Sequence, residues 1–165
     1  ASVVYKRQYI HGAMSAVTSG RLSSFYRTAE RLGLQIPDEY IREAAYRDTA
    51  TTYRMTNELL DLPDPPTCII YPDDFASFGG INAIRERGLQ IPEDISVAGY
   101  DGIQSARQLE PRLTTVQQDT EQIGCLAARE LISLIERPKT TIIEQVIVPG
   151  KVVEGKSVAQ IPTDK

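Results

Sequence analysis

Residues 91–101, with the sequence IPEDISVAGYD, indicate the fold of this chain of 165 residues. The apolar run 95–99 is predicted to be a β-strand, and the polar pair Tyr100 and Asp101 follows it directly. Comparable units lie on both sides: short apolar runs of strand length alternate with longer segments whose apolar residues recur at helical spacing. This alternation predicts an α/β fold, a doubly wound parallel sheet flanked by helices.

The remaining elements are predicted by working outward from that strand. Further strands are expected at residues 8–11, within 38–45, and at 67–71, 113–116, 141–148 and 151–153. Helices are expected at residues 21–32, 49–60, 74–87, 102–109 and 119–136. Residues 67–71 are almost wholly apolar, as is typical of a strand with both faces covered. Pro149 and Gly150 are expected to form a tight turn between the last two strands.

Composition narrows the classes of protein. With 41% hydrophobic and 24% charged residues, the chain is typical of one globular domain with a sizeable core. Its net charge of −4 argues against a direct grip on a phosphate backbone. No apolar run has the length of a membrane helix, and no leader begins the chain, so we expect a soluble protein. Cys68 and Cys125 are interpreted as small core residues of a reducing compartment.

Polar and aromatic residues follow the predicted strands at their carboxyl ends, where ligands bind in open parallel sheets. The candidate residues at this edge are Arg21, Tyr46, Asp73 and Asp101. A guanidinium, an aromatic ring and two carboxylates suit a small polyhydroxylated or heteroaromatic molecule. Because clustered carboxylates repel phosphates and acids, we expect a sugar or a nucleoside-like ligand.

Simpler interpretations stand beside these assignments. Asp74 begins a predicted helix, so a capping role alone is its leading alternative. Arg21 has the alternative of a solvated charge in the first helical turn.

Asp73, Asp74 and Asp101 together could hold Mg²⁺ in an α/β enzyme. However, His11 is the single histidine and no nucleophile or base has a recognisable spacing, so we expect neither an enzyme nor a cofactor.

Several of these stretches resemble the lactose/galactose-repressor family of transcriptional regulators. Residues 91–101 are similar to the family's fourth strand and the loop after it. The other similar stretches are RLSSF (residues 21–25), PTCIIYPDD (66–74), EPRLTTVQQ (110–118) and KVVEGKS (151–157). Two departures are Ser24, where the family has glycine, and Gly155, where a basic residue is usual. The similarity covers nearly the whole chain, in the family's order.

The resemblance implies a periplasmic-binding-protein-like (type I) fold and an effector site. The family's effector-contacting positions correspond to Arg21, Tyr46, Asp73, Asp101 and Gln118. Several members have asparagine where Asp73 stands. It also implies a cytoplasmic, homodimeric repressor that binds operator DNA through a helix-turn-helix head lying outside this chain.

The resemblance further divides the chain, as a truncated effector-binding domain, into two parts. Residues 1–116 and 140–158 would form the core of a second subdomain. Residues 117–139 would form a crossover and a helix belonging to a first subdomain that is largely absent here. Without that partner, the apolar stripe of the helix is expected to dock on its own sheet or on a second copy. The stripe consists of Ile123, Leu126, Ala127, Leu131, Leu134 and Ile135.

One alternative from another class shares this crevice. A solute-binding protein of a sugar transporter would use the same aromatic and carboxylate groups but would be exported. The cysteine usage and the motifs at residues 92–97 and 113–116 favour the repressor. A purely structural module remains the simplest alternative, because folds of this type host many functions.

Overall fold

The computed structural model describes residues 7–142 and 145–159. Its sheet has the order β2-β1-β3-β4-β5-β6, and only β6 runs antiparallel, to β5. The strands are β1 (Arg7–His11), β2 (Ile41–Glu43), β3 (Cys68–Ile70), β4 (Ser96–Asp101), β5 (Thr114–Gln117) and β6 (Lys151–Val153). The predicted α/β fold with a doubly wound, largely parallel sheet is therefore confirmed.

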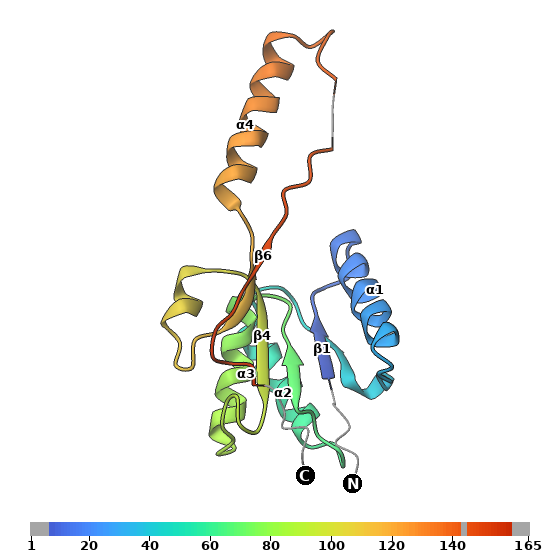
Figure 1. Cartoon of the computed structure of the whole chain (residues 1–165), viewed down its shortest axis with the longest axis vertical. Coiled ribbons are helices and arrows are strands. Elements are labelled where there is room, and N and C mark those ends of the chain that lie inside the picture. The colour runs from blue at the N-terminus through green and yellow to red at the C-terminus, as the bar shows by residue number, and fades with distance from the viewer. Residues whose placement is uncertain (1–6, 143–144, 160–165) are drawn as a thin grey trace.

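Helices lie on both faces of this sheet. The α-helices are α1 (Ala16–Arg31), α2 (Thr49–Leu60), α3 (Asp74–Glu86) and α4 (Thr120–Glu136), and the 3₁₀ helices are η1 (Asp38–Tyr40) and η2 (Gln104–Gln108). The chain moves from β1 to β2 in one direction and from β2 through β3 to β4 in the other, so right-handed crossovers place α1 opposite α2 and α3. Figure 1 shows α1 apart from the α2–α3 pair. The direction reverses between β1 and β3, which is where such sheets open a ligand crevice.

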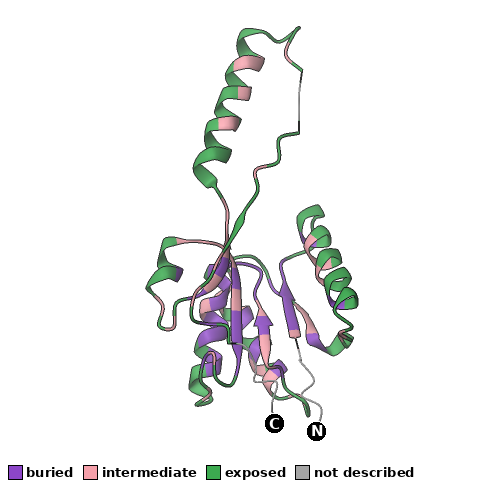
Figure 2. Cartoon of the chain, viewed as in Figure 1, coloured by how far each residue is buried: buried purple, intermediate pink, exposed green. Residues whose placement is uncertain are grey.

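The main core lies between the sheet and the α2–α3 pair, and the buried residues in Figure 2 concentrate there. Its fully buried members include Ile10, Leu59, Ile69, Ile84 and Val97. Glycine allows α3 to approach this closely, because a Cβ on Gly80 would lie 1.8 Å from the hydroxyl of Tyr71. The sheet and the α2–α3 pair thus form one close-packed unit.

Helix α4 was predicted in the right place but with the wrong surroundings. It projects beyond the sheet, and residues 145–150 lead back from it to β6 (Figure 1). No residue of α4 is buried, so the expectation that it docks on its own sheet is wrong. The connection at Gln118 and Asp119 carries the helix past the strand ends, out of reach of the core. Docking on a second copy stays a prediction.

Three local expectations are also wrong. Helix α1 begins at Ala16, because the side chain of Ser15 accepts a hydrogen bond from the backbone of Thr18 and caps the helix there. Within residues 141–148, the described positions form no strand, since β5 already pairs with β4 on one side and with β6 on the other. Cys125 is exposed because α4 has no covering layer. Ile143 and Glu144 lie outside the described residues.

Candidate ligand crevice

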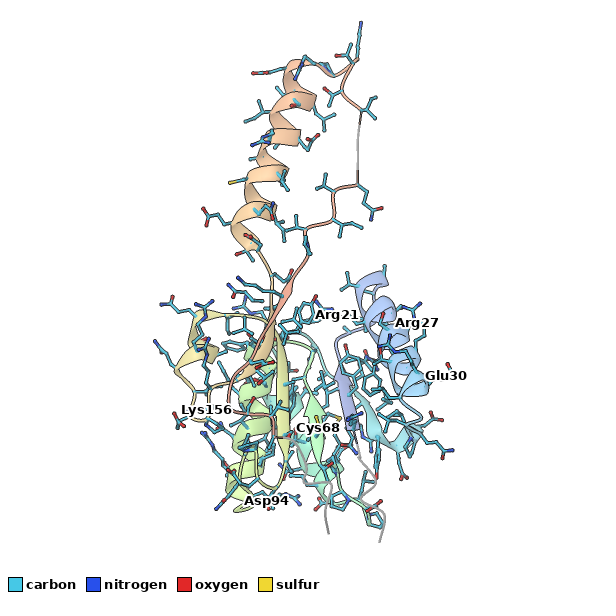
Figure 3. The ribbon with its side chains drawn as sticks, viewed as in Figure 1. Arg21, Arg27, Glu30, Cys68, Asp94 and Lys156 are labelled. Carbon is cyan, nitrogen blue, oxygen red and sulfur yellow. The ribbon has the colours of Figure 1, made fainter. Side chains whose placement is uncertain are left out.

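Arg21 lies at the centre of the polar edge where the parallel strands end. Its guanidinium donates a hydrogen bond of 3.1 Å to the carbonyl of Pro72, in the loop after β3. Its Cζ atom lies 3.6 Å from the ring centroid of Tyr100 and 5.9 Å from that of Tyr46. In Figure 3 the side chain sits at the upper edge of the sheet, below α4. Arg21 is therefore part of the crevice, and the interpretation of a solvated charge does not fit.

Tyr46 is fixed beside Arg21 by α1 and by the chain after β1. Its hydroxyl forms a hydrogen bond of 2.9 Å with the hydroxyl of Thr18. Its ring packs on the backbone at Gly12, where a Cβ would lie 2.2 Å from a ring carbon. Any larger residue at position 12 would displace the ring. Tyr46 keeps 37% of its surface exposed, which leaves part of the side chain accessible to a ligand.

Asp101 and Gln118 are joined directly. The side-chain amide of Gln118 donates 2.6 Å to Oδ1 of Asp101, and its backbone amide donates 3.2 Å to the Asp101 carbonyl. Burial raises the pKa of Asp101, while the Gln118 hydrogen bond and the charge of Arg21 oppose that rise. The structure thus brings together a carboxylate and the first residue of the crossover toward α4.

Asp73 is built into the scaffold more than its sequence position suggests. It is the N-cap of α3, with Oδ1 accepting 2.7 Å from the amide of Ala76. Oδ2 accepts 2.8 Å from the amide of Arg47, in the loop after β2. Its carboxylate thus joins the loop after β2 to the start of α3. Because only 2% of Asp73 is exposed, its contact with a ligand stays a prediction.

Asp74 does not cap α3, so the alternative given for it was wrong. Its side chain is fully buried, and Oδ2 accepts hydrogen bonds from the amides of Gly102 at 2.7 Å and Ile103 at 2.9 Å. Oδ1 accepts 2.6 Å from the hydroxyl of Thr115 in β5. Burial raises the pKa of Asp74, and these hydrogen bonds oppose that rise. Asp74 connects α3 to the loop after β4.

Two crevice residues were not among the assigned site residues. Tyr100 is the ring on which Arg21 stacks, and its aromatic side chain beside Asp101 at a strand end was a usable signal. Arg47 has its Cζ 5.4 Å from the ring of Phe75, and its φ is +60°. A positive φ at a residue other than glycine leaves no mark in the sequence, so the orientation of Arg47 was not predictable.

A hollow of about 260 Å³ adjoins Gln118 on the side of α4. It is lined by Gln117, Gln118, Asp119, Thr120, Glu121, Pro149 and Lys151. Over residues 7–142 and 145–159, no group of three or more His, Cys, Asp or Glu side chains is arranged to hold a metal ion. The carboxylate oxygens of Asp73 and Asp74 already accept hydrogen bonds from backbone amides and from the hydroxyl of Thr115. The geometry suits recognition of a small molecule by stacking and hydrogen bonds.

Comparison with known proteins gives consistent results. A family model described as a periplasmic binding protein-like domain matches residues 9–158. The probable HTH-type transcriptional repressor ExuR of Bacillus subtilis (strain 168) is 39% identical over 107 residues, which cover 65% of this chain and 32% of the relative. The HTH-type transcriptional repressor PurR of Serratia proteamaculans (strain 568) is 33% identical over 156 residues, covering 93% of this chain and 45% of the relative. The chain therefore spans less than half the length of these curated relatives.

Solved structures agree on the fold. A protein from Bacillus cereus subsp. cytotoxis NVH 391-98, described as a transcriptional regulator of LacI type, superimposes with a TM-score of 0.90. It is 24% identical, and the match covers 96% of this chain and 56% of the other. At this identity the likeness concerns the fold alone. No helix in the described part of the chain is long and apolar enough to cross a membrane.

Proposed function

Since the chain belongs to the periplasmic binding protein-like domain family, in the form found in LacI-type transcriptional repressors, we propose that it is the ligand-sensing domain of such a repressor. The observation that carries this proposal is the arrangement of Arg21 between Tyr46 and Tyr100, next to Asp101. These groups stand at the strand ends, near the switch point where sheets of this topology bind small molecules.

The ligand that fits these groups is a sugar or a nucleoside-like molecule. The carboxylate of Asp101 can accept hydrogen bonds from two neighbouring hydroxyls or N–H groups, and a tyrosine ring offers an apolar surface for the flat face of a ring. Arg21 already stacks on Tyr100, which orients its planar donors. Asp73 adds negative charge behind the site, which disfavours phosphorylated ligands.

The ligand would act through the crossover. Gln118 joins Asp101 to the connection that leads into α4, so a ligand that engages Asp101 also affects this connection. In the whole repressor, a cytoplasmic homodimer, the arrangement of α4 and its subdomain would set the spacing of two DNA-binding heads on operator DNA. The ligand shifts DNA affinity only by the difference between its affinities for the two arrangements.

A fluorescence-anisotropy titration of the complete gene product against its own upstream DNA tests this proposal. D-galactose, D-glucose, adenosine and guanosine serve as added compounds. We expect one of them to change DNA affinity at least about fivefold, the lower end of typical allosteric coupling. Asp101→Ala should abolish that change, because it removes the carboxylate that the ligand engages.

The matched control is Asp61→Ala, which removes an exposed carboxylate paired with Arg87. Asp61 lies at the C-terminal end of α2, whereas the crevice adjoins the loop before the N-terminal end of this helix. It should leave the ligand effect intact. A complete product that ignores DNA but binds one of the sugars would contradict the repressor and favour a transport-linked binding protein. A product that binds DNA without any ligand effect would contradict the sensing role.

A further inference from the structure

Asp74 is a buried carboxylate with an unusual set of partners. Its described hydrogen-bond donors all belong to the part of the chain from Gly102 to Thr115, whereas Asp74 itself stands at the beginning of α3. A carboxylate with no exposed surface is costly to keep in a protein interior unless donors compensate it. Here the two amides and the hydroxyl from that part of the chain supply the compensation.

That loop begins directly after Asp101, whose backbone is strained. Asp101 has φ of +110°, a region that residues with a side chain rarely adopt. Such a conformation costs free energy and persists only where the surroundings impose it. Gln118 donates hydrogen bonds to the backbone carbonyl and to the carboxylate of Asp101. Asp74 accepts hydrogen bonds from the next two backbone amides, those of Gly102 and Ile103.

Two glycines, at the end of β4 and in the loop after it, allow these contacts between Asp74 and the loop. A Cβ on Gly99 would lie 2.3 Å from Oδ1 of Asp74, so glycine lets the carboxylate reach β4. Gly102 has φ of +75°, and a Cβ there would lie 2.6 Å from the side chain of Gln117. Glycine thus leaves room for the Asp74 carboxylate at position 99 and permits the positive φ at position 102, whose amide Asp74 bonds.

We propose that Asp74 is a positioning residue of the ligand site: by its hydrogen bonds to Gly102, Ile103 and Thr115 it holds Asp101 in the conformation that presents its carboxylate beside Arg21 and Gln118. This inference rests on the proposed function in its reference to a ligand. Asp74 acts through Asp101 and does not touch the ligand. What matters is its hydrogen-bond geometry, and its negative charge is dispensable.

Three variants separate these possibilities. Asp74→Ala removes every bond to the loop. Thr115→Val removes one donor and keeps the size of the side chain. Asp74→Asn keeps an oxygen for the two amides, and its NH₂ group can donate to the hydroxyl of Thr115, which can also accept. The matched control is Thr56→Val, which removes a hydroxyl that is also buried and is bonded to Tyr71 at 2.8 Å in the main core.

The direct measurement is made on the chain without ligand by NMR. The three-bond coupling between the amide and α protons of Asp101 depends on φ, and amide exchange reports the bonds of Gly102 and Ile103. We expect Asp74→Ala and Thr115→Val to change the coupling and speed the exchange, and Asp74→Asn and Thr56→Val to leave both nearly unchanged. Even if Asp74→Ala fails to fold, Thr115→Val against Thr56→Val decides the question.

Isothermal titration of the complete gene product and its variants with D-galactose, D-glucose, adenosine and guanosine adds the functional measurement. For the compound that binds the unaltered product, loss of one buried hydrogen bond in Thr115→Val should weaken affinity about threefold to tenfold, and Thr56→Val should not. An unchanged Asp101 coupling in Thr115→Val, or an Asp74→Asn variant as defective as Asp74→Ala, would overturn the inference. Absence of binding by all four compounds to the complete gene product would count against the proposed function instead, while the NMR result still decides the role of Asp74.

Discussion

Helices α3 and α4 both carry an apolar stripe, but their surroundings are opposite. In α3 the buried residues include Ala76, Gly80, Ala83 and Ile84, which face the sheet. In α4 no residue is buried, and Leu131 and Ile135 expose 59% and 70% of their surface. Helix α3 follows directly from β3 and returns to β4, so its position on the sheet is fixed by its two connections. Helix α4 has connections that lead away from the sheet.

The comparison shows what an amphipathic pattern does and does not specify. The spacing of apolar residues determines which face of a helix needs a partner. It does not determine whether that partner is the same sheet, another part of a longer protein or a second copy. We call α4 with residues 137–142 and 145–150 the arm. We expect its exposed apolar side chains to form a contact surface, because such patches are uncommon on surfaces that remain in water.

A leucine pair tests the contrast with the largest expected effect. Leu59 in α2 is fully buried, whereas Leu131 in α4 is 59% exposed. Leu59→Ala should lower the free energy of unfolding by about 2 to 5 kcal/mol, because it removes buried methyl groups and leaves a cavity. Leu131→Ala should change it by less than about 0.5 kcal/mol, as is usual for surface positions. Urea denaturation of both variants, followed by circular dichroism, measures the difference.

A large effect of Leu131→Ala would break the comparison. It would mean that the arm is packed in solution. Repeating the denaturation over a range of protein concentrations then identifies the partner, since packing on a second copy makes the stability depend on concentration.

A glycine pair sharpens the same comparison with effects of opposite sign. A Cβ on Gly80 in α3 would lie 1.8 Å from the buried hydroxyl of Tyr71, so Gly80→Ala should destabilise the protein by about 1 to 3 kcal/mol through overpacking. A Cβ on Gly124 in α4 would meet nothing within 4 Å. Gly124→Ala should therefore stabilise the helix by about 0.8 to 1 kcal/mol through propensity alone. Thermal melts and helical ellipticity report the two effects, and destabilisation by Gly124→Ala would show that the arm packs closely on something.

The parts of the fold that sequence reasoning predicted well are those with local causes. Helix α2 was predicted from Thr49 to Leu60 with the right ends, because Asp48 caps its start and a proline-rich turn follows it. The parallel sheet followed from the alternation of short apolar runs with helical segments. The strand expected at residues 141–148 failed for a non-local reason, since a strand exists only where another strand can pair with it.

The candidate site divides in the same way. Arg21, Tyr46 and Asp101 were placed at one edge because the ends of parallel strands meet there, and the structure brings them together. The capping role expected for Asp74 belongs to Asp73, since both are acids beside the start of a helix and only the fold shows which one reaches the amide of Ala76. The support that Asp74 gives to the loop after Asp101 depends on contacts made 28 and 29 residues away, which no local pattern contains.

The two cysteines give the test with the smallest perturbation, because it requires no change to the chain. Cys125 lies exposed on the arm, whereas Cys68 lies in β3, where burial raises the pKa of its thiol to about 11. Since the thiolate is the reactive form, iodoacetamide at pH 8 should modify Cys125 rapidly and Cys68 very slowly, with mass spectrometry of peptides as the measurement. Cys125→Ser is the control and should remove the rapid phase entirely. Rapid reaction of Cys68 would contradict the packing of the sheet. Slow reaction of Cys125 that becomes rapid on dilution would instead show that a second copy covers the arm, because the apolar stripe of α4 would then have found the partner that its own sheet does not provide.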